Sequence, residues 1–324
     1  MNKICVTGAN GFIGKSICKT LAQMNKSVEG FVRTSNSSLN LTNFKHVSVG
    51  DISQRMNWKD KLDSYDCIIH CAGKAHRIKE KDKLDSYLSI NAEGTKYLAE
   101  QAAKAGVKRF IFLSTIKVNG ENTNTIKNDN VQKIKNKNIF THNDKPYPQD
   151  AYAISKFEAE KILWEISART GLEVVVLRLP LVYGKDVKGN LKNLTKLLSF
   201  GVPLPFSLVN NKRSLIGIDN LVDIIIRCID HPNVTGKTFL ISDGEDLSTS
   251  DLFHYMAIAM KSRLRLFPFP ISILKFVSRI IGRKSEMNRL TDSLQVDSSS
   301  IRETLNWTPS VSVEEGIKRM FRNS

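Results

Sequence analysis

The chain has 324 residues, of which 41% are hydrophobic and 25% charged, values typical of a globular protein with one large or two modest domains. The sequence has neither a run of 18 apolar residues nor a signal-peptide pattern, so we expect no transmembrane helix and a cytoplasmic location. Five cysteines without a C-x-x-C pair predict buried thiols in a reducing compartment, and they exclude an obvious metal site.

The net charge of +16 raises the question of an anionic partner. We expect no nucleic-acid partner, because the sequence lacks a helix-turn-helix pattern, a zinc-finger pattern and a basic strand interleaved with aromatic residues. Much of the excess charge lies in Lys- and Asn-rich stretches such as residues 123–145. Two interpretations remain: a biased composition with solvated lysines, or attraction of anionic substrates or membrane lipids.

The N-terminus predicts a strand, a glycine turn and a helix. Residues 4–6 form an apolar run, as expected for a parallel strand buried on both faces. Gly8, Gly11 and Gly14 follow with the spacing G-x-x-G-x-x-G, and residues 15–22 have helical apolar spacing. Such a turn lets backbone N–H groups meet a pyrophosphate at the positive end of a helix. An ordinary tight turn is the alternative, but the position after the first strand favours a dinucleotide site.

The next two predicted strands end at residues that would face the adenosine part of a dinucleotide. Residues 27–33 form the second strand, and it ends in Arg33 where an acid usually holds the ribose 2′-hydroxyl. Arginine suits a 2′-phosphate, so the sequence favours NADP(H) over NAD, although Arg33 would also stack on adenine. Residues 46–51 form a third strand ending in Asp51, which either contacts the adenine amino group or caps a turn or helix.

Strands and helices alternate through the first half of the chain. The fourth strand, residues 67–73, ends on Cys71, Ala72 and Gly73, small residues where a cofactor would pass close by. A helix at 84–105, which contains Asn91, precedes a fifth strand at 109–115. The alternation predicts an α/β fold with right-handed crossovers and a doubly wound parallel (Rossmann) sheet.

The second half of the chain is less regular. Residues 119–150 form a long polar loop, either a lid or a surface insertion. A helix at 151–170 and a sixth strand at 172–179 follow; further on we expect helices at 192–200 and 220–230, strands at 213–218 and 238–242, and mostly helical structure in the last 80 residues. We therefore expect a dinucleotide-binding domain of residues 1–178 plus about 214–242, and a smaller, mostly helical substrate lobe of residues 179–213 plus 243–324.

Tyr152 and Lys156 in the segment AYAISK carry the predicted chemistry. They are four residues apart, so one helical turn places both side chains on the same face. An ammonium near a phenol lowers the pKa of the phenol and makes it usable as an acid or base. Thr115 adds a hydroxyl at the carboxyl edge of the sheet, where α/β sheets bind ligands. A Tyr-x-x-x-Lys spacing on a solvated helix face, without function, is the alternative.

The order of these motifs resembles the extended short-chain dehydrogenase/reductase family, the nucleotide-sugar epimerases, dehydratases and reductases. The resemblance runs nearly end to end, through TGANGFIG, HCAG, NAEGT, LSTIKVNG, YAISK, LRLPLVYG, RSLIGIDNLVD and LNWTPSVSVEEGI. It implies that Tyr152 is the acid/base, that Lys156 holds the nicotinamide ribose and tunes Tyr152, and that Thr115 hydrogen-bonds a sugar oxygen. It also implies that Asn91 helps position the lysine through the backbone.

The resemblance further implies two sets of binding residues. For the cofactor these are Gly8, Asn10, Gly11, Phe12, Ile13, Gly14, Arg33, Asp51, Ile52, Cys71, Ala72, Gly73, Tyr152, Lys156 and Pro180. For a nucleoside-diphosphate sugar they are Lys74, Ser114, Thr115, Lys117, Asn190, Leu204, Arg213 and Arg289, the two arginines facing the pyrophosphate unless they form surface salt bridges. Asn119 stands where the family usually has tyrosine and is expected to change how the sugar is held. Ala153 replaces a more usual glycine.

Within the family, the chain is most similar to enzymes acting at C4 of UDP-N-acetylhexosamines in bacterial surface-polysaccharide synthesis. This implies a 4-ketoreductase, which Arg33 favours over the other activities. The alternative is a 4-epimerase that retains NAD, and a more remote one is a non-catalytic dinucleotide-binding regulator. Dehydration is disfavoured because Ile116 and Lys117 stand where dehydratases carry an acid pair.

The resemblance also implies a homodimer through the helices around 86–105 and 152–170, with support from Ile154, Phe157 and Ile162. Residues 264–283, rich in apolar and basic side chains, would either lie on a membrane surface or pack as an ordinary helix of the lobe.

Overall fold

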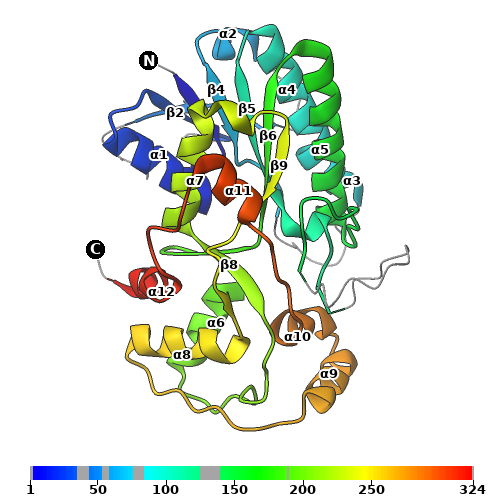
Figure 1. Cartoon of the computed structure of the whole chain (residues 1–324), viewed down its shortest axis with the longest axis vertical. Helices are drawn as coiled ribbons and strands as arrows, with labels where there is room; N and C mark the ends of the chain where they lie inside the picture. The colour runs from blue at the N-terminus through cyan, green and yellow to red at the C-terminus, as the bar shows by residue number, and fades with distance from the viewer. Residues whose placement is uncertain are drawn as a thin grey trace.

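A parallel sheet of seven strands organises the larger part of the molecule (Figure 1). The computed structural model describes residues 3–34, 44–52, 58–75, 84–124, 139–187 and 190–322. In the order β3-β2-β1-β4-β5-β6-β9, the strands are β1 (Ile4–Thr7), β2 (Val28–Val32), β3 (Lys45–Ser48), β4 (Cys67–His70), β5 (Arg109–Thr115), β6 (Glu173–Leu179) and β9 (Lys237–Leu240). All neighbours pair in parallel, which confirms the doubly wound sheet.

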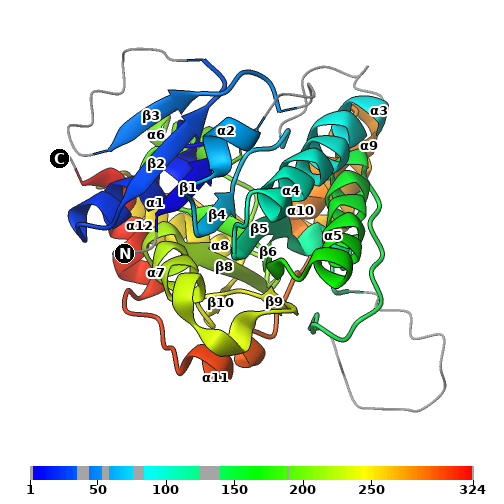
Figure 2. The same ribbon diagram turned by 90° about the horizontal axis from the view of Figure 1, so that it is seen from above.

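Helices cover both faces of this sheet, as Figure 2 shows from above. One face packs against α1 (Phe12–Gln23), α7 (Ile218–Asp230) and α11 (Ser299–Leu305), and the other against α2 (Lys59–Leu62), α4 (Gly94–Lys104) and α5 (Ala151–Thr170). Between β4 and α4 lie α3 (Leu84–Tyr87) and a π-helical turn, η1 (Leu88–Glu93). Because both faces are covered, the central strands consist of uninterrupted apolar runs.

The smaller lobe contains a second sheet and most of the C-terminal helices. Its strands are β7 (Leu181–Tyr183), β8 (Arg213–Gly217) and β10 (Asp246–Leu247), in the order β10-β8-β7. Its helices are α6 (Asn190–Ser199), α8 (Thr249–Met260), α9 (Ile271–Ile280), α10 (Lys284–Thr291) and α12 (Val313–Phe321). Two 3₁₀ turns, η2 (Ile116–Val118) and η3 (Pro232–Val234), complete the described elements. None of the helices in the described ranges is long and apolar enough to span a bilayer.

Two elements lie on the other side of the expected domain division. β8 was expected in the dinucleotide-binding domain, yet it pairs with β7 and β10. Pro180, which has no N–H for a ladder, separates β6 from β7, so β7 starts a new sheet that β8 joins. In the other direction, Ile301, Leu305 and Trp307 of the C-terminal segment pack in the core beneath the large sheet. The division itself stays a prediction, with these two elements exchanged.

Two smaller expectations also change, and a third falls outside the described residues. The third strand ends at Ser48, so Asp51 lies in the loop beyond it rather than at its end. Asn119 does not face a sugar: it is buried, and its side chain accepts from Arg178 Nη1 at 2.8 Å and donates to the Thr141 carbonyl at 3.2 Å. The middle of the 119–150 segment, residues 125–138, lies outside the described residues. The interpretation of this segment as a lid or a surface insertion therefore stays a prediction.

Candidate active site

The glycine turn between β1 and α1 has the shape of a phosphate cradle. Gly8 has φ +66°, and a Cβ there would lie 2.9 Å from the backbone of Ala72. A Cβ at Gly14 would lie 2.4 Å from the carbonyl oxygen of Gly8. Helix α1 begins after Gly11 without a side-chain cap, so the N–H groups of its first turn have no side-chain acceptor. These residues fit the pyrophosphate of a dinucleotide, whose charge would satisfy those donors.

The other predicted cofactor residues gather at the same carboxyl edge of the sheet. Asn10 is exposed, and Phe12 and Ile13 form the first turn of α1. Arg33 is exposed just beyond β2, and its carbonyl accepts from the Gly50 N–H at 3.1 Å. Asp51 and Ile52 are half-buried in the next loop, with Ile52 against the start of α4, and Cys71, Ala72 and Gly73 follow β4 directly.

A buried histidine fixes the end of β4 next to the glycine turn. His70 lies between two hydroxyls, with Nδ1 2.7 Å from Thr7 Oγ1 and Nε2 3.0 Å from Thr95 Oγ1. Burial lowers the pKa of His70 to about 3, so its ring is neutral at physiological pH. The Ala72 N–H donates to the same Thr7 hydroxyl at 3.2 Å. This network holds Cys71 to Gly73 in place. Its only signal in the sequence is the polar residue at the end of each of two apolar strands.

Thr115, Tyr152 and Lys156 come together where β5 and α5 meet. Asp150 caps α5 by accepting from the Ala153 N–H at 2.7 Å, which fixes where the helix begins and where Tyr152 lies on it. The Thr115 hydroxyl hydrogen-bonds to the Tyr152 phenol. One turn further along, Lys156 is buried with Nζ 4.0 Å from the centroid of the Phe112 ring.

The prediction that the lysine lowers the pKa of Tyr152 is wrong for the chain's own groups. Desolvation and the nearby Asp150 carboxylate raise the pKa of Tyr152 to about 12, against the hydrogen bond from Thr115. Burial lowers the pKa of Lys156 to about 8, which the charge of Glu160 partly opposes. Burial therefore makes the protonated form of Lys156 less favourable, and burial also raises the pKa of the phenol.

Asn91 lies beside the group but holds a different segment from the one expected. Its Oδ1 accepts from the Lys74 N–H at 2.7 Å, and its Nδ2 donates to the Lys74 carbonyl at 3.0 Å and to Ser155 Oγ at 2.9 Å. Asn91 thus fixes the loop after β4 against α5 through the backbone of Lys74. A Cβ on Gly73 would lie 3.0 Å from Asn91 Oδ1 and 3.8 Å from Lys156 Nζ, so it would press on the Asn91 side chain.

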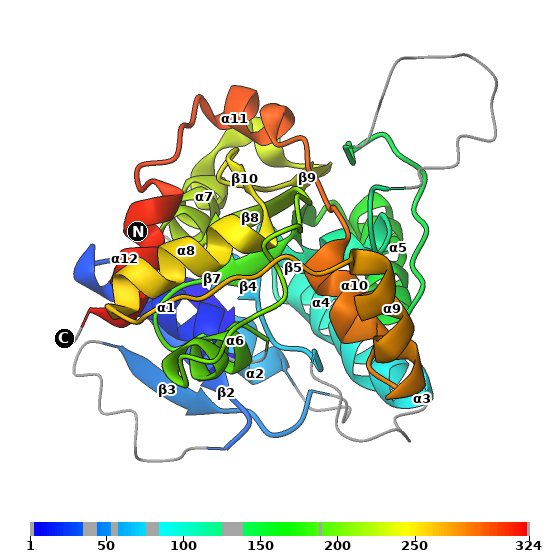
Figure 3. The same ribbon diagram turned by 90° about the horizontal axis from the view of Figure 1, so that it is seen from below.

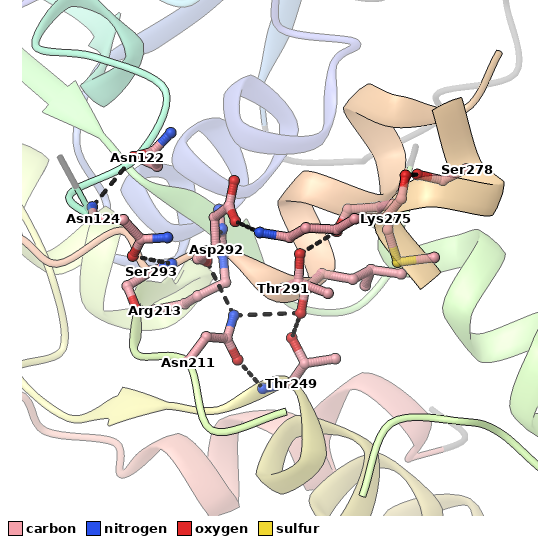
Figure 4. A network of polar contacts seen from close by, with 12 residues as sticks. Asn122, Asn124, Asn211, Arg213, Thr249, Lys275, Ser278, Thr291, Asp292 and Ser293 are labelled. Atoms are coloured by element: carbon pink, nitrogen blue, oxygen red, sulfur yellow. Dashed lines mark hydrogen bonds and ion pairs between the residues drawn. The ribbon is translucent and has the colours of Figure 1, made fainter. Parts of the chain in front are cut away.

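A cleft of about 1070 Å³ runs from Tyr152 and Thr115 toward the smaller lobe. Two of the predicted phosphate-binding residues, Arg213 and Arg289, line it. Arg213 Nη1 donates to the Asp292 carbonyl at 2.9 Å (Figure 4), and burial together with the nearby charge of Arg289 lowers the pKa of Arg213 to about 10. Arg289 Nε is buried and has no hydrogen-bond partner among the described residues. Two guanidinium groups this close are suited to a diphosphate.

The remaining predicted substrate residues divide into those at the cleft and those away from it. Lys117 lines the cleft, with Nζ 2.6 Å from Asp150 and 2.7 Å from Glu121, and Pro180 lines it too. Lys74 Nζ donates to Ser86 Oγ at 2.8 Å near its edge. Asn190 begins α6, but its side chain lies outside the described residues.

Ser114 and Leu204 are corrections. Adjacent strand residues point to opposite faces, so with Thr115 at the cleft the Ser114 hydroxyl points to the other side and donates to Glu160. Leu204 is buried in the core of the smaller lobe, because its backbone pairs with Arg265 and Phe267.

Most of the apolar wall of the cleft could not be predicted from the sequence. The lining includes Tyr87, whose ring lies tilted 6.5 Å from the Tyr152 ring, Leu179 at the end of β6, and a set of leucines from the smaller lobe. These leucines are Leu181, Leu191, Leu194, Leu215, Leu247, Leu252, Leu290 and Leu294. They have no shared spacing in the sequence, so no pattern could have predicted them. Among the described residues no group of three His, Cys, Asp or Glu side chains is placed to hold a metal ion.

A tyrosine that shares a helix face with lysine, beside a glycine cradle at the carboxyl edge of a doubly wound sheet, defines the class of extended short-chain dehydrogenases/reductases. Residues 4–242 match the NAD dependent epimerase/dehydratase family, and the chain belongs to that family.

Comparison with known proteins agrees with this assignment over nearly the whole chain. A UDP-glucose 4-epimerase of Vibrio cholerae is 40% identical over 98% of this chain and 93% of its own length. An N-acetyl-alpha-D-glucosaminyl-diphospho-ditrans,octacis-undecaprenol 4-epimerase of Escherichia coli O157:H7 is 23% identical over 87% of this chain and 82% of its own. The structure of a UDP-glucose 4-epimerase from Thermotoga maritima with UDP-glucose superposes with a TM-score of 0.76 at 22% identity, covering 99% and 97% of the two chains.

Proposed function

We propose that the chain is an NAD-dependent epimerase that inverts C4 of a UDP-hexose or UDP-N-acetylhexosamine. The observation that carries this proposal is the 40% identity, over 98% of the chain, to a UDP-glucose 4-epimerase. It favours epimerisation over the 4-ketoreductase expected first from the sequence. The cleft supports it, because the proton-transferring group lies at one end and two arginines line the same space.

The chain's own residues supply proton transfer and anchoring. Tyr152 takes the proton of the C4 hydroxyl as that carbon is oxidised, and it returns the proton to the oxygen when the carbon is reduced again from the other side. Thr115 hydrogen-bonds to the phenol and lies where it would also contact the reacting oxygen. The turn formed by Gly8, Gly11 and Gly14 would hold NAD, which when bound would supply reversible hydride exchange with C4, so that neither protons nor cofactor are consumed overall. Arg213 and Arg289 would hold the diphosphate throughout.

A second candidate, a 4-ketoreductase that uses NADPH, rests on Arg33. This residue lies exposed directly after β2, where it would neutralise a ribose 2′-phosphate, and it stands at the position where an acid would hold a ribose 2′-hydroxyl. For the epimerase we infer that Arg33 instead stacks on the adenine. A role in surface-polysaccharide synthesis, for either activity, stays a prediction from the resemblance.

The cofactor content of the purified chain separates the two candidates. We expect NAD to remain bound after gel filtration, to be released on denaturation, and UDP-glucose or UDP-N-acetylglucosamine to be converted to its C4 epimer without added cofactor. A chain that is purified without cofactor, shows no epimerisation and oxidises NADPH with a 4-keto sugar would contradict the epimerase and support the reductase.

The role of Tyr152 is tested by Tyr152→Phe. Removal of the phenolic oxygen is expected to lower kcat by about 10²–10⁴-fold, because general acid–base catalysis contributes that much, while NAD stays bound. Tyr87→Phe, on the neighbouring ring, is the matched control and should retain most of the activity. Equal turnover of Tyr152→Phe and parent would remove the phenol from the mechanism.

We also propose a homodimer through α4 and α5. Ile154, Phe157 and Ile162 lie on α5 and are all partly exposed in the single chain, as expected for side chains that a second copy would cover. Light scattering on the full chain tests this proposal, with Phe157→Glu expected to give monomers.

A further inference from the structure

Helix α9 turns an apolar face to solvent. Ile273, Phe276, Val277 and Ile280 follow the spacing i, i+3, i+4, i+7, and their exposed fractions are 46%, 62%, 46% and 71%. The spacing places them on one side of the helix. The opposite side is the one that packs on the lobe, through residues such as Leu274, in contact with the lobe core, and the buried Ser278. A surface helix normally shows the reverse arrangement, so this face needs a partner.

Two further large apolar side chains are exposed close to the two ends of the helix in the sequence. Ile281, directly after α9, is 62% exposed, and Phe267, in the segment before it, is 39% exposed. In Figures 1 and 3 this part of the chain lies at the outer edge of the smaller lobe.

The charged residues of the segment that carries this face are all of one sign. Residues 252–285 contain seven Lys and Arg and no Asp or Glu. Lys275 points inward and pairs with Asp292 at 2.6 Å (Figure 4). The other six are exposed: Lys261, Arg263, Arg265, Arg279, Arg283 and Lys284. The face is therefore an apolar stripe with a basic border.

We propose that α9 docks on an anionic membrane surface, lying in the plane of the lipid headgroups with Phe276 and Ile280 in the acyl boundary. An apolar face bordered by lysine and arginine is the arrangement of interfacial helices, in which burial of apolar area and attraction to acidic lipids act together. A second copy of this chain is a poorer partner, because a two-fold interface would bring like charges together. Nucleic acid would pair with the cations but would leave the aliphatic stripe exposed.

Docking in this way would place the substrate cleft beside the lipid. Only residues 281–283 separate α9 from α10, and α10 contributes Glu286, Arg289 and Leu290 to the cleft. On the inner side of α9, Lys275 holds the Asp292 carboxylate, while the Asp292 carbonyl accepts from Arg213 (Figure 4). The membrane-facing helix and the arginines of the cleft are thus joined by a short series of contacts.

Flotation of the full chain with vesicles tests the proposal without any use of catalysis. We expect the chain to float with vesicles of equal parts phosphatidylglycerol and phosphatidylcholine and not with phosphatidylcholine alone, and to lose binding as salt is raised. Phe276→Ser/Ile280→Ser should weaken binding by about tenfold or more, because two large apolar side chains no longer enter the lipid. Arg279→Glu/Arg283→Glu should weaken it to a similar extent.

Matched controls lie on the other part of the molecule. Met24→Ser removes an apolar side chain that is 50% exposed, and Lys19→Glu/Lys26→Glu reverses two exposed charges; both should bind as the parent does. Thermal unfolding of each variant shows that it is folded. The proposal is overturned if the parent does not float, if Phe276→Ser/Ile280→Ser floats unchanged, or if that variant changes a dimer into a monomer, which would make the face an interface between copies.

Discussion

The buried ion pair between Glu160 and Arg178 allows a sharp prediction about stability. The two side chains are 2% and 6% exposed, and Arg178 Nη2 lies 2.6 Å from Glu160 Oε2. Ser114 also donates to this carboxylate, and Arg178 Nη1 donates to Asn119. In Glu160→Gln the guanidinium stays buried without an opposite charge, which costs about 3–5 kcal/mol. An unfolding entropy of about 2.1 cal/mol/K per residue gives roughly 0.7 kcal/mol/K for this chain, so Tm should fall by about 4–7 °C.

Differential scanning calorimetry of the parent, Glu160→Gln and the double variant Glu160→Met/Arg178→Met measures this effect. The double variant removes both charges and leaves only neutral groups unpaired, so it should be more stable than the single variant. Surface pairs give a matched control: Glu314→Gln, which breaks the exposed pair with Lys318, should change Tm by less than about 1 °C. A Tm for Glu160→Gln within about 1 °C of the parent would refute the reasoning, and so would a double variant less stable than the single one.

Three further predictions concern the active site. In Asp150→Asn the helix cap is kept but the charge that raises the pKa of Tyr152 is lost, so the acid limb of the pH profile of kcat/KM should move to lower pH; an unmoved limb would contradict this. Lys156→Met should unfold with about 3 kcal/mol more free energy than the parent at pH 7, because burial lowers the pKa of Lys156 from 10.5 to about 8. Buried Lys156 destabilises the folded parent only while it is protonated, so this destabilisation is complete below pH 8 and vanishes above pH 10.5. The free energies of unfolding of the two proteins, measured by urea titration, should therefore converge as pH rises. Gly14→Ala places a methyl 2.4 Å from the carbonyl oxygen of Gly8, and the purified variant should contain little NAD by absorbance and chromatography, whereas normal content would exclude the cradle.

The features that could be predicted from the sequence are those that depend on local patterns. Apolar runs gave the strands of the large sheet because both faces of that sheet are covered, and helical spacing placed Tyr152 one turn from Lys156. The glycine spacing also predicted a backbone turn whose shape needs no information from the rest of the chain. Each of these patterns extends over only a few residues, and the contacts that determine the local structure lie within the same segment.

The features that could not be predicted depend on which segments meet in space. Ser114 and Thr115 are both hydroxyl residues at the end of one strand, and only the position of α5 decides that the first meets Glu160 and the second the cleft. The place of Asn119 in a motif predicts an effect on how the sugar is held, but its side chain instead accepts a hydrogen bond from Arg178 of the next strand. Leu204 follows a proline in a turn and is nevertheless buried, because residues 265–267 pair with its backbone.

The pKa of Tyr152 shows a different kind of difficulty. Asp150, whose charge opposes ionisation of the phenol, stands only two residues away and was visible in the sequence. Its effect depends on the burial of the phenol, because a carboxylate in water would be screened. Burial at a cleft between two lobes is not encoded in the helix that carries these residues.

The route of the chain between its two lobes has a consequence for biosynthesis. The core below the large sheet includes Ile4 at one end of the chain and Trp307 at the other, and strand β9 completes that sheet only after β7 and β8 have begun the other one. A ribosome that has released the first 178 residues has therefore delivered a nucleotide fold that still lacks one edge strand and two covering helices. We expect this intermediate to stay open until translation is nearly finished, so a late stop codon should be as damaging to this protein as an early one.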